Sequence, residues 1–192
     1  SAKLAQYQQA LFDDVRGTFE NLQQQDTAGK LTVADLPEVL RNRFIGVTGH
    51  HDPYVHLEML KRYDKYDTIL MPLNMADPGY LSFEKLVLPV AVERGLGIQG
   101  MKSTANSKLL QNFSIGDCLR YTLSLPVHCV AMGALTPGQI EDDVRIAQSF
   151  QPFESARMEE LRKQAARMAG PRLEDWKRNT EQAGVRATHT DG

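Results

Sequence analysis

The stretch RFIGVTGHHDP, which runs from Arg43 to Pro53, has the pattern of a short strand that ends abruptly in a polar turn. Residues 44–48 are mostly apolar or β-branched, as strand residues commonly are. After the turn, Asp52 and Pro53 form a helix start, with a carboxylate at the N-cap and a proline at the first helical position. The stretch therefore predicts a strand followed directly by a helix.

The same pattern returns three times further along the chain. Apolar runs at residues 68–73, 96–101 and 128–133 are each followed by a helical pattern, so the units repeat at intervals of about 25 to 30 residues. Strands that are apolar almost throughout and alternate with helices are typical of βαβ units, whose parallel sheet is buried on both faces. We predict the α/β class. Periodicity alone leaves both a doubly wound sheet and a barrel open, and in either one ligands bind at the carboxyl ends of the strands.

Helix signals place the crossover segments. We expect helices over residues 53–63 and 83–94, and two more that begin at Ser114 and Thr136, where Asp117 and Gln139 give capping-box spacing. A charged helix follows from Ala156 to Met168, and a last helix that carries Trp176 restarts at Pro171.

The first 42 residues differ in composition from the rest of the chain. They are rich in glutamine and have apolar residues at helical spacing, which predicts one long amphipathic helix and a short one from Thr32. We therefore divide the chain into an N-terminal helical segment (1–42), a domain of four strand and helix units (43–153), and C-terminal helices with a tail (154–192).

The bulk composition narrows the possible partners. A net charge of -2 provides no basic surface for nucleic acid or anionic membrane. The longest apolar stretch, residues 86–92, falls short of the roughly 20 residues that a spanning helix needs. The two cysteines, Cys118 and Cys129, have no disulfide or metal-binding spacing, so we expect buried, reduced thiols and a cytoplasmic protein. The chain does not open with Met, which predicts a processed chain or a fragment.

Small, polar or cationic residues follow each predicted strand. They are the residues of a phosphate or sugar site: Thr48 to His51, Asn74 to Asp77, Lys102 to Asn106, and Gly133 to Thr136. The helix that starts at Thr136 could receive an anion at its N–H groups, and Lys102 could add the matching charge. The alternatives are that Thr136 only begins a helix and that Lys102 is an ordinary solvated lysine. His50, His51 and His56 are poorly spaced for a metal, and we expect none.

Four segments together resemble a known family. They read RFIGVTGHHDP, DTILMPLNMADP, LVLPVAVERGLGIQGMK and ALTPGQIEDDVRIAQSFQPF. In this order and spacing they look like strands five to eight of an aldo/keto reductase, from about Arg43 to Phe153, with the family's tail up to Arg178. The resemblance implies a partial TIM-type (β/α) barrel of four parallel strands preceded by an added N-terminal helical segment. It also implies NADPH-dependent reduction of a carbonyl, or the reverse oxidation.

The resemblance further implies a set of cofactor-binding residues. Thr48 and Gly49 would hold the nicotinamide carboxamide, and Met101 would lie under the nicotinamide. Lys102 and Ser103 would lie near the pyrophosphate. The segment for the adenosine phosphate would be Gly133, Ala134, Leu135, Thr136, Gln139, Asp142 and Asp143.

Three positions in the adenosine-phosphate segment depart from the family's pattern. Gly133 and Gln139 stand where basic residues usually grip the 2′-phosphate of NADP, and Asp143 stands where an asparagine is customary. Carboxylates repel a phosphate, so NAD(H) is less disfavoured here than is usual for the family.

The family's catalytic Asp, Tyr, Lys and His come from the first four strands and cannot be placed in this chain. We therefore expect the cofactor-binding half of a reductase, inactive alone, that needs a missing N-terminal half or a second copy before it can act on a small carbonyl substrate. The alternative is a non-enzymatic half-barrel that serves as a scaffold or partner-binding protein. Dinucleotide binding separates the two.

Overall fold

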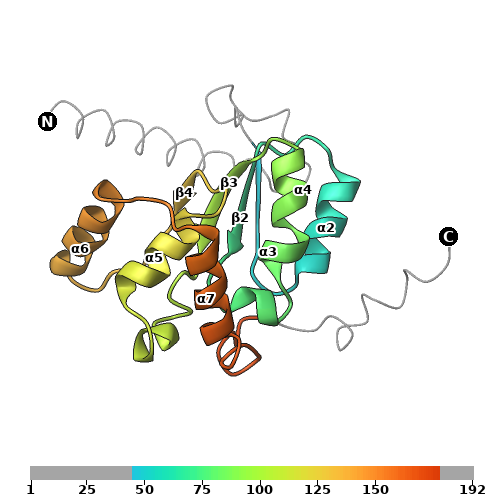
Figure 1. Ribbon diagram of the computed structural model, residues 1–192. Helices are drawn as coiled ribbons and strands as arrows, with labels where there is room; N and C mark the ends of the chain where they lie inside the picture. Colours follow the sequence, from blue (N-terminus) through green and yellow to red (C-terminus); the bar gives the residue numbers. More distant parts are fainter. Residues whose placement is uncertain (1–44, 178–192) are drawn as a thin grey trace, which may run out of the picture. The chain divides into compact units, whose positions relative to one another are not determined.

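Four parallel strands form the centre of the described part of the chain. The computed structural model describes residues 45–177 (Figure 1), which belong to a compact unit beginning at Phe44. The strands are β1 (Gly46–Thr48), β2 (Thr68–Pro72), β3 (Gly97–Met101) and β4 (Cys129–Val130), hydrogen-bonded in the order β1-β2-β3-β4. Every neighbouring pair is parallel. The predicted α/β class and four-stranded partial barrel are confirmed. The helices expected within residues 1–42 lie outside the described residues.

Helices connect the strands as the crossover pattern predicts. They are α2 (Pro53–Arg62), η3 (Asp77–Gly79), α3 (Phe83–Leu86), α4 (Leu88–Glu93), η4 (Lys108–Gln111), α5 (Ile115–Leu123), α6 (Pro137–Gln148) and α7 (Ser155–Ala165). The predicted N-caps are confirmed. The side chains of Asp52, Ser114 and Thr136 each accept a backbone N–H from the first turn of their helix.

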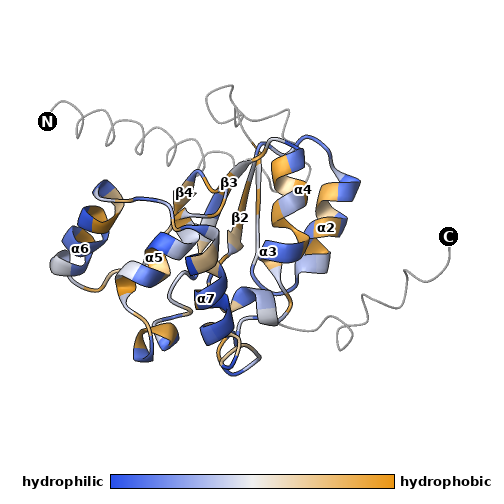
Figure 2. Cartoon of the chain, in the orientation of Figure 1, coloured by the Kyte–Doolittle hydropathy of each residue, from blue (hydrophilic) through white to orange (hydrophobic). Residues whose placement is uncertain are grey.

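The two faces of the sheet have different surroundings. Side chains alternate along a strand, so Val47, Ile69 and Ile98, which are in register, point to the same face and are buried in the core. The opposite face carries the register row Thr48, Leu70, Gln99 and Cys129, which is partly or fully exposed. In Figure 2, β2 and parts of α4 and α5 carry the hydrophobic colour, whereas α7 is largely hydrophilic.

Some sequence predictions prove wrong in detail. The single helix expected over residues 83–94 is divided at Val87 into α3 and α4, because Pro89 has no N–H to continue the helical ladder. The helix expected after Pro171 is a series of turns. The strand expected at residues 128–133 shortens to Cys129–Val130.

Cys129 is also exposed, although the sequence predicts a buried thiol. It lies in the two-residue strand at the end of the strand order, on the face opposite the helices, and no further strand within residues 45–177 covers it. Cys118 is buried, as predicted.

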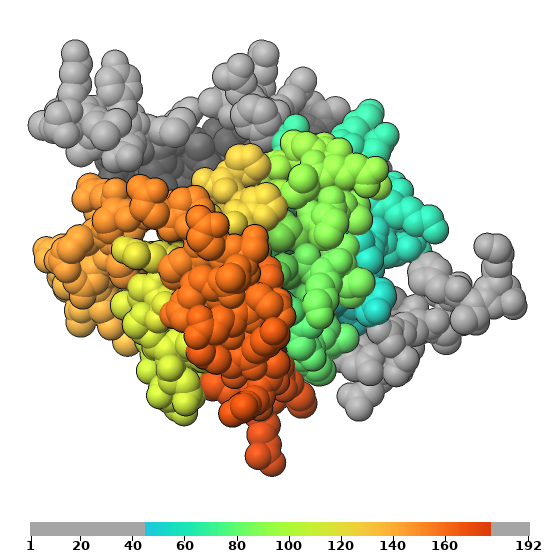
Figure 3. Space-filling view, viewed as in Figure 1, coloured from blue at the N-terminus to red at the C-terminus, as the bar shows by residue number. Residues whose placement is uncertain are grey.

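Helix α6 contributes least to the core. None of its residues is buried, and Ile140 and Val144 are largely exposed. In the space-filling view it forms a lobe at one side of the described unit, next to α5 (Figure 3). None of the helices within residues 45–177 has the length and the apolar composition to cross a membrane.

Candidate functional site

The loop after β3 has an unusual backbone. Four of its residues have positive φ although none is glycine: Lys102 (61°), Ala105 (50°), Asn106 (55°) and Ser107 (66°). The left-handed region costs an L-residue roughly 1–2 kcal/mol. Strained backbone of this kind concentrates at ligand sites. The loop is therefore a candidate for a binding role at the carboxyl end of the sheet.

A cavity of about 350 Å³ opens beside this loop, and we call it the lysine pocket. Its lining consists of Met101, Lys102, Ser103, Thr104, Asn106, Ser107, Ala131, Met132 and Gly133. The Lys102 ammonium donates to the side-chain oxygen of Asn106 at 2.7 Å and lies 5.3 Å from the centre of the Trp176 ring. Both partners are uncharged, and the lining contains no carboxylate. The pocket therefore presents positive charge.

The Ser103 hydroxyl is the second polar feature of the lysine pocket. Ser103 is only 1% exposed, and its Oγ has no hydrogen-bond partner among the described residues. A buried hydroxyl without a partner is costly, and such groups commonly mark a place where a ligand or water completes the bonding. With Lys102 beside it, the donor chemistry suits a phosphate.

A second cavity of about 230 Å³ adjoins the first, and we call it the aspartate pocket. Its lining consists of Thr104, Ser107, Leu110, Ile115, Gly133, Gln139, Asp142 and Asp143, so the two pockets share Thr104, Ser107 and Gly133. Burial raises the pKa of Asp143, and so does the neighbouring charge of Asp142. No cationic side chain lines this pocket, so its charge is opposite to that of the lysine pocket.

The structure gathers one part of the predicted site. Met101, Lys102 and Ser103 line the lysine pocket, Gln139, Asp142 and Asp143 line the aspartate pocket, and Gly133 lines both. Thr48, Gly49, Ala134, Leu135 and Thr136 line neither. Thr48 lies on β1, the first strand of the order, and Leu135 is 95% exposed.

Gly49 has a packing role in the structure. A Cβ at this position would lie 2.7 Å from the ring of His56, which is buried beneath it. His56 in turn packs edge-on against Phe83, and burial lowers the pKa of its imidazole. A glycine is therefore needed here for close packing, whether or not a ligand binds.

The N-terminus of α6 finds internal partners. The Thr136 hydroxyl accepts the N–H of Gln139, and the side-chain oxygen of Gln139 accepts the N–H groups of Leu135 and Thr136. This capping box occupies the N–H groups of Leu135, Thr136 and Gln139 at the start of the helix that the sequence offered as an anion site. These contacts are the ones expected of a plain helix start, which was the alternative to an anion site in the sequence analysis.

Sequence reasoning missed a cluster of buried charges. The ammonium of Lys177 lies 2.6 Å from Asp77 Oδ1 and 2.9 Å from Glu174 Oε1, and all three side chains are fully buried. Asn74 donates to Glu174, and the Lys177 ammonium also donates to the carbonyl of Tyr80. Asn74 and Asp77 belong to the strand-end residues that the sequence singled out. Lys177 and Asp77 are a hundred residues apart, so no local sequence pattern indicates that they pair.

The buried charges hold the segment from Leu173 to Lys177 against the ends of the strands. There, the ring of His51 hydrogen-bonds the carbonyl of Trp176, and the ring of His50 lies beside that of His51 at a tilt of 56°. Partial burial lowers the pKa of His50, and the nearby His51 and Lys102 lower it further. The turn after β1 is therefore directed at the C-terminal segment. No group of three metal-ligating side chains occurs within residues 45–177.

This architecture, four parallel strands with crossover helices and pockets beyond the strand ends, is that of half a (β/α)₈ barrel. No family model and no curated protein matches the sequence. Two solved structures, the holo and apo forms of "aldo-keto reductase AKR11C1 from Bacillus halodurans", match with a TM-score of 0.52 at 20% identity over 64% of this chain. The chain spans about half the length of these structures, 50% and 51%. The fold is therefore similar to that of part of an aldo/keto reductase barrel.

Proposed function

We propose that this chain is the dinucleotide-binding half of an aldo/keto reductase-like oxidoreductase. The observation that supports the proposal most strongly is the pair of adjoining pockets at the carboxyl ends of β3 and β4. One pocket contains a lysine and an unpartnered buried hydroxyl, and most of the predicted cofactor residues line one pocket or the other. Carboxyl ends of parallel strands are where ligands bind in barrels and open sheets alike.

The residues of the lysine pocket suit a pyrophosphate and the ring beside it. Lys102 supplies a cation, and the Ser103 hydroxyl supplies a donor that no protein group uses. Met101, on the same face of β3 as Gln99, offers an apolar and polarisable surface to a planar ring. A bound NAD(P)H supplies hydride to the carbonyl carbon of a small substrate. The part of this chain is to bind and orient the cofactor.

The proton for the carbonyl oxygen must come from outside the described residues in this proposal. Tyr121 is buried among the helices, where its hydroxyl donates to Glu84 at 2.7 Å and accepts from Arg162 at 2.8 Å. Neither pocket is lined by a tyrosine or a histidine. We therefore propose that a complementing N-terminal half or a second copy supplies the acid. Two free cysteines fit a reducing compartment, so the proposal includes the cytoplasm.

A non-enzymatic half-barrel is the second candidate, and helix α6 favours it. The helix has no buried residue, Ile140 and Val144 on it are exposed, and so is Leu135 just before it, so apolar surface is available for a protein partner. In this case the strand-end pockets are inherited features without a ligand.

Titration with NADH and NADPH tests the proposal. Both cofactors fluoresce, and Trp176, the only tryptophan, contacts Lys102, so binding has two optical readouts. We expect saturable binding that Lys102→Met weakens by about tenfold, because one attractive charge is lost. The matched control is Lys163→Met, which removes an exposed lysine of α7. Absence of binding to either dinucleotide by a chain with native circular dichroism contradicts the proposal and favours the scaffold.

A further inference from the structure

We infer that the aspartate pocket selects a dinucleotide without a 2′-phosphate, so that this chain binds NAD(H) in preference to NADP(H). The inference rests on the proposed function, since it concerns the same two pockets. Its starting point is the separation of charge between them, a cation in one lining and two carboxylates in the other.

A ligand that occupies both pockets meets these charges in a fixed order. The pockets join at Thr104, Ser107 and Gly133, so a pyrophosphate beside Lys102 directs the remainder of the ligand towards Asp142 and Asp143. A 2′-phosphate carries about -1.5 to -2 charges at neutral pH. The lining contains no cation, and of its two carboxylates only Asp142 has an ion-pair partner among the described residues, so a phosphate placed here is repelled mainly by Asp143. An unphosphorylated ribose carries no charge and avoids this repulsion.

Asp143 is the carboxylate best placed to recognise that ribose. Asp142 forms an ion pair with Arg145 at 2.7 Å, whereas Asp143 forms none within residues 45–177. Asp143 is also the less exposed of the two. A carboxylate can accept a hydrogen bond from a ribose 2′-hydroxyl, as an acidic residue does for NAD in Rossmann folds.

The neighbouring Gln139 does not offset the negative charge. Its side-chain oxygen is held by the N–H groups of Leu135 and Thr136, which fixes the amide at the start of α6. An amide supplies neither the charge nor the bidentate geometry with which arginine binds phosphate. Burial raises the pKa of Asp143, and the neighbouring charge of Asp142 raises it further.

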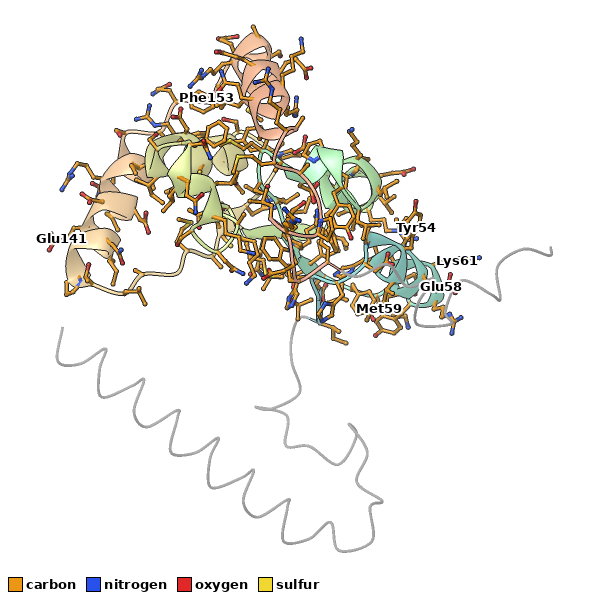
Figure 4. The ribbon with its side chains drawn as sticks, turned by 90° about the horizontal axis from the view of Figure 1, so that it is seen from below. Tyr54, Glu58, Met59, Lys61, Glu141 and Phe153 are labelled. Atoms are coloured by element: carbon orange, nitrogen blue, oxygen red, sulfur yellow. The ribbon has the colours of Figure 1, made fainter. Side chains whose placement is uncertain are left out.

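The test compares the dissociation constants of NADH and NADPH for the unmodified chain and for Asp143→Asn. We expect NADH to bind at least about tenfold more tightly than NADPH in the unmodified chain. Asp143→Asn should reduce this ratio by about tenfold, mainly by tightening NADPH, because the substitution removes one repulsive charge. The matched control is Glu141→Gln on the same helix, which removes an exposed carboxylate outside the pocket lining (Figure 4) and should leave the ratio unchanged.

The possible outcomes separate this inference from the proposed function. If NADPH binds as tightly as NADH or more tightly, the inference is wrong while the proposed function stands. An equal effect of Glu141→Gln and Asp143→Asn also overturns it, because the preference then reflects overall charge. If neither dinucleotide binds to the folded chain, both proposals fail. A ratio that favours NADH and falls only with Asp143→Asn supports the inference.

Discussion

At the scale of the residue, Lys177 compensates the charge of two buried carboxylates. Its ammonium is fully buried and shared between Asp77 and Glu174, with a carbonyl as a further acceptor. Asp77 also accepts from the Ser82 hydroxyl and from two backbone N–H groups of α3. Burial raises the pKa of Glu174, while Lys177 lowers it. The carboxylates therefore depend on this one cation for compensation.

We expect Lys177→Met to destabilise the protein by about 3–5 kcal/mol, because two carboxylates are then buried without a counter-charge. Urea unfolding followed by circular dichroism measures the difference. Lys163→Met is the control, because this lysine is 75% exposed and its loss should change stability by less than about 0.5 kcal/mol. Equal small effects of the two variants would show that the buried ion triad contributes little.

The carboxyl group of Asp117 makes the stability of the folded protein depend on pH in the acid range. Partial burial raises the pKa of this carboxyl, but hydrogen bonds from Ser114 and Arg157 outweigh it, so the pKa lies below the usual 3.8. A lowered pKa in the folded state contributes stability above pH 3.8, and that contribution is lost as the pH falls through the folded value. We expect Asp117→Asn to cost about 1–2 kcal/mol at pH 7 and nothing once Asp117 is protonated.

Unfolding by urea at pH 7 and at successively lower pH measures this difference between Asp117→Asn and the unmodified chain. The gap between their midpoints should narrow below pH 3.8. Asp64→Asn, an exposed residue in the loop after α2, is the charge-matched control and should change stability by less than about 0.5 kcal/mol at pH 7. A gap that persists at the lowest pH would mean that Asp117 acts through packing instead of charge.

At the scale of elements, α6 is the helix that tertiary contacts support least. It has a complete capping box at Thr136 and a proline at its first position, yet it buries no residue. Its stability therefore depends on local interactions to a greater degree than that of α5, where Cys118, Leu119, Tyr121 and Thr122 are buried.

We expect Thr136→Ala to destabilise α6 by about 1 kcal/mol while changing global unfolding little, because the cap is the main interaction lost. Amide hydrogen exchange should show faster exchange in residues 137–148 and unchanged exchange in the strands. Thr136→Ser, which keeps the hydroxyl, should restore the protection. Faster exchange across the whole sheet would instead show that α6 is coupled to the core.

At the scale of the whole molecule, the two cysteines differ in exposure and therefore in reactivity. Cys129 is exposed on the open face of the sheet, while Cys118 is buried. Burial raises the pKa of the Cys118 thiol to about 12, and the charge of Asp117 adds to this effect. Thiolate is the reactive form, so Cys118 is protected from reagents both by its burial and by the protonation of its thiol.

A thiol reagent should therefore modify one equivalent rapidly and the second only at the rate of global unfolding. Cys129→Ser should abolish the rapid phase and leave the slow one. Rapid modification of both thiols would show that α5 opens locally. Measured over a range of protein concentrations, the rapid phase also tests complementation by a second copy, because a closed barrel would cover the face that carries Cys129.

Local patterns were sufficient for much of the fold. The alternation of strands and helices, the three N-caps and the polar residues after each strand were all predicted from the sequence, because each depends on residues within one turn or one strand. The break at Val87 was also a local matter, since Pro89 marks it, but the apolar pattern through residues 83–94 concealed it. The strand-end loop of β3 was predicted as part of a site, although its left-handed backbone was not.

Contacts between distant parts of the chain determined the rest. Lys177 reads as a surface lysine in sequence, and only the fold brings it to Asp77, a hundred residues earlier. Cys129 reads as a core residue, and its place in the last strand of the order leaves it exposed. The sequence by itself determined the elements and their caps, because hydrogen bonds and side-chain periodicity act over a few residues. Burial, and with it the pairing of charges and the two pockets, was decided by the tertiary structure, because burial depends on which segments pack together.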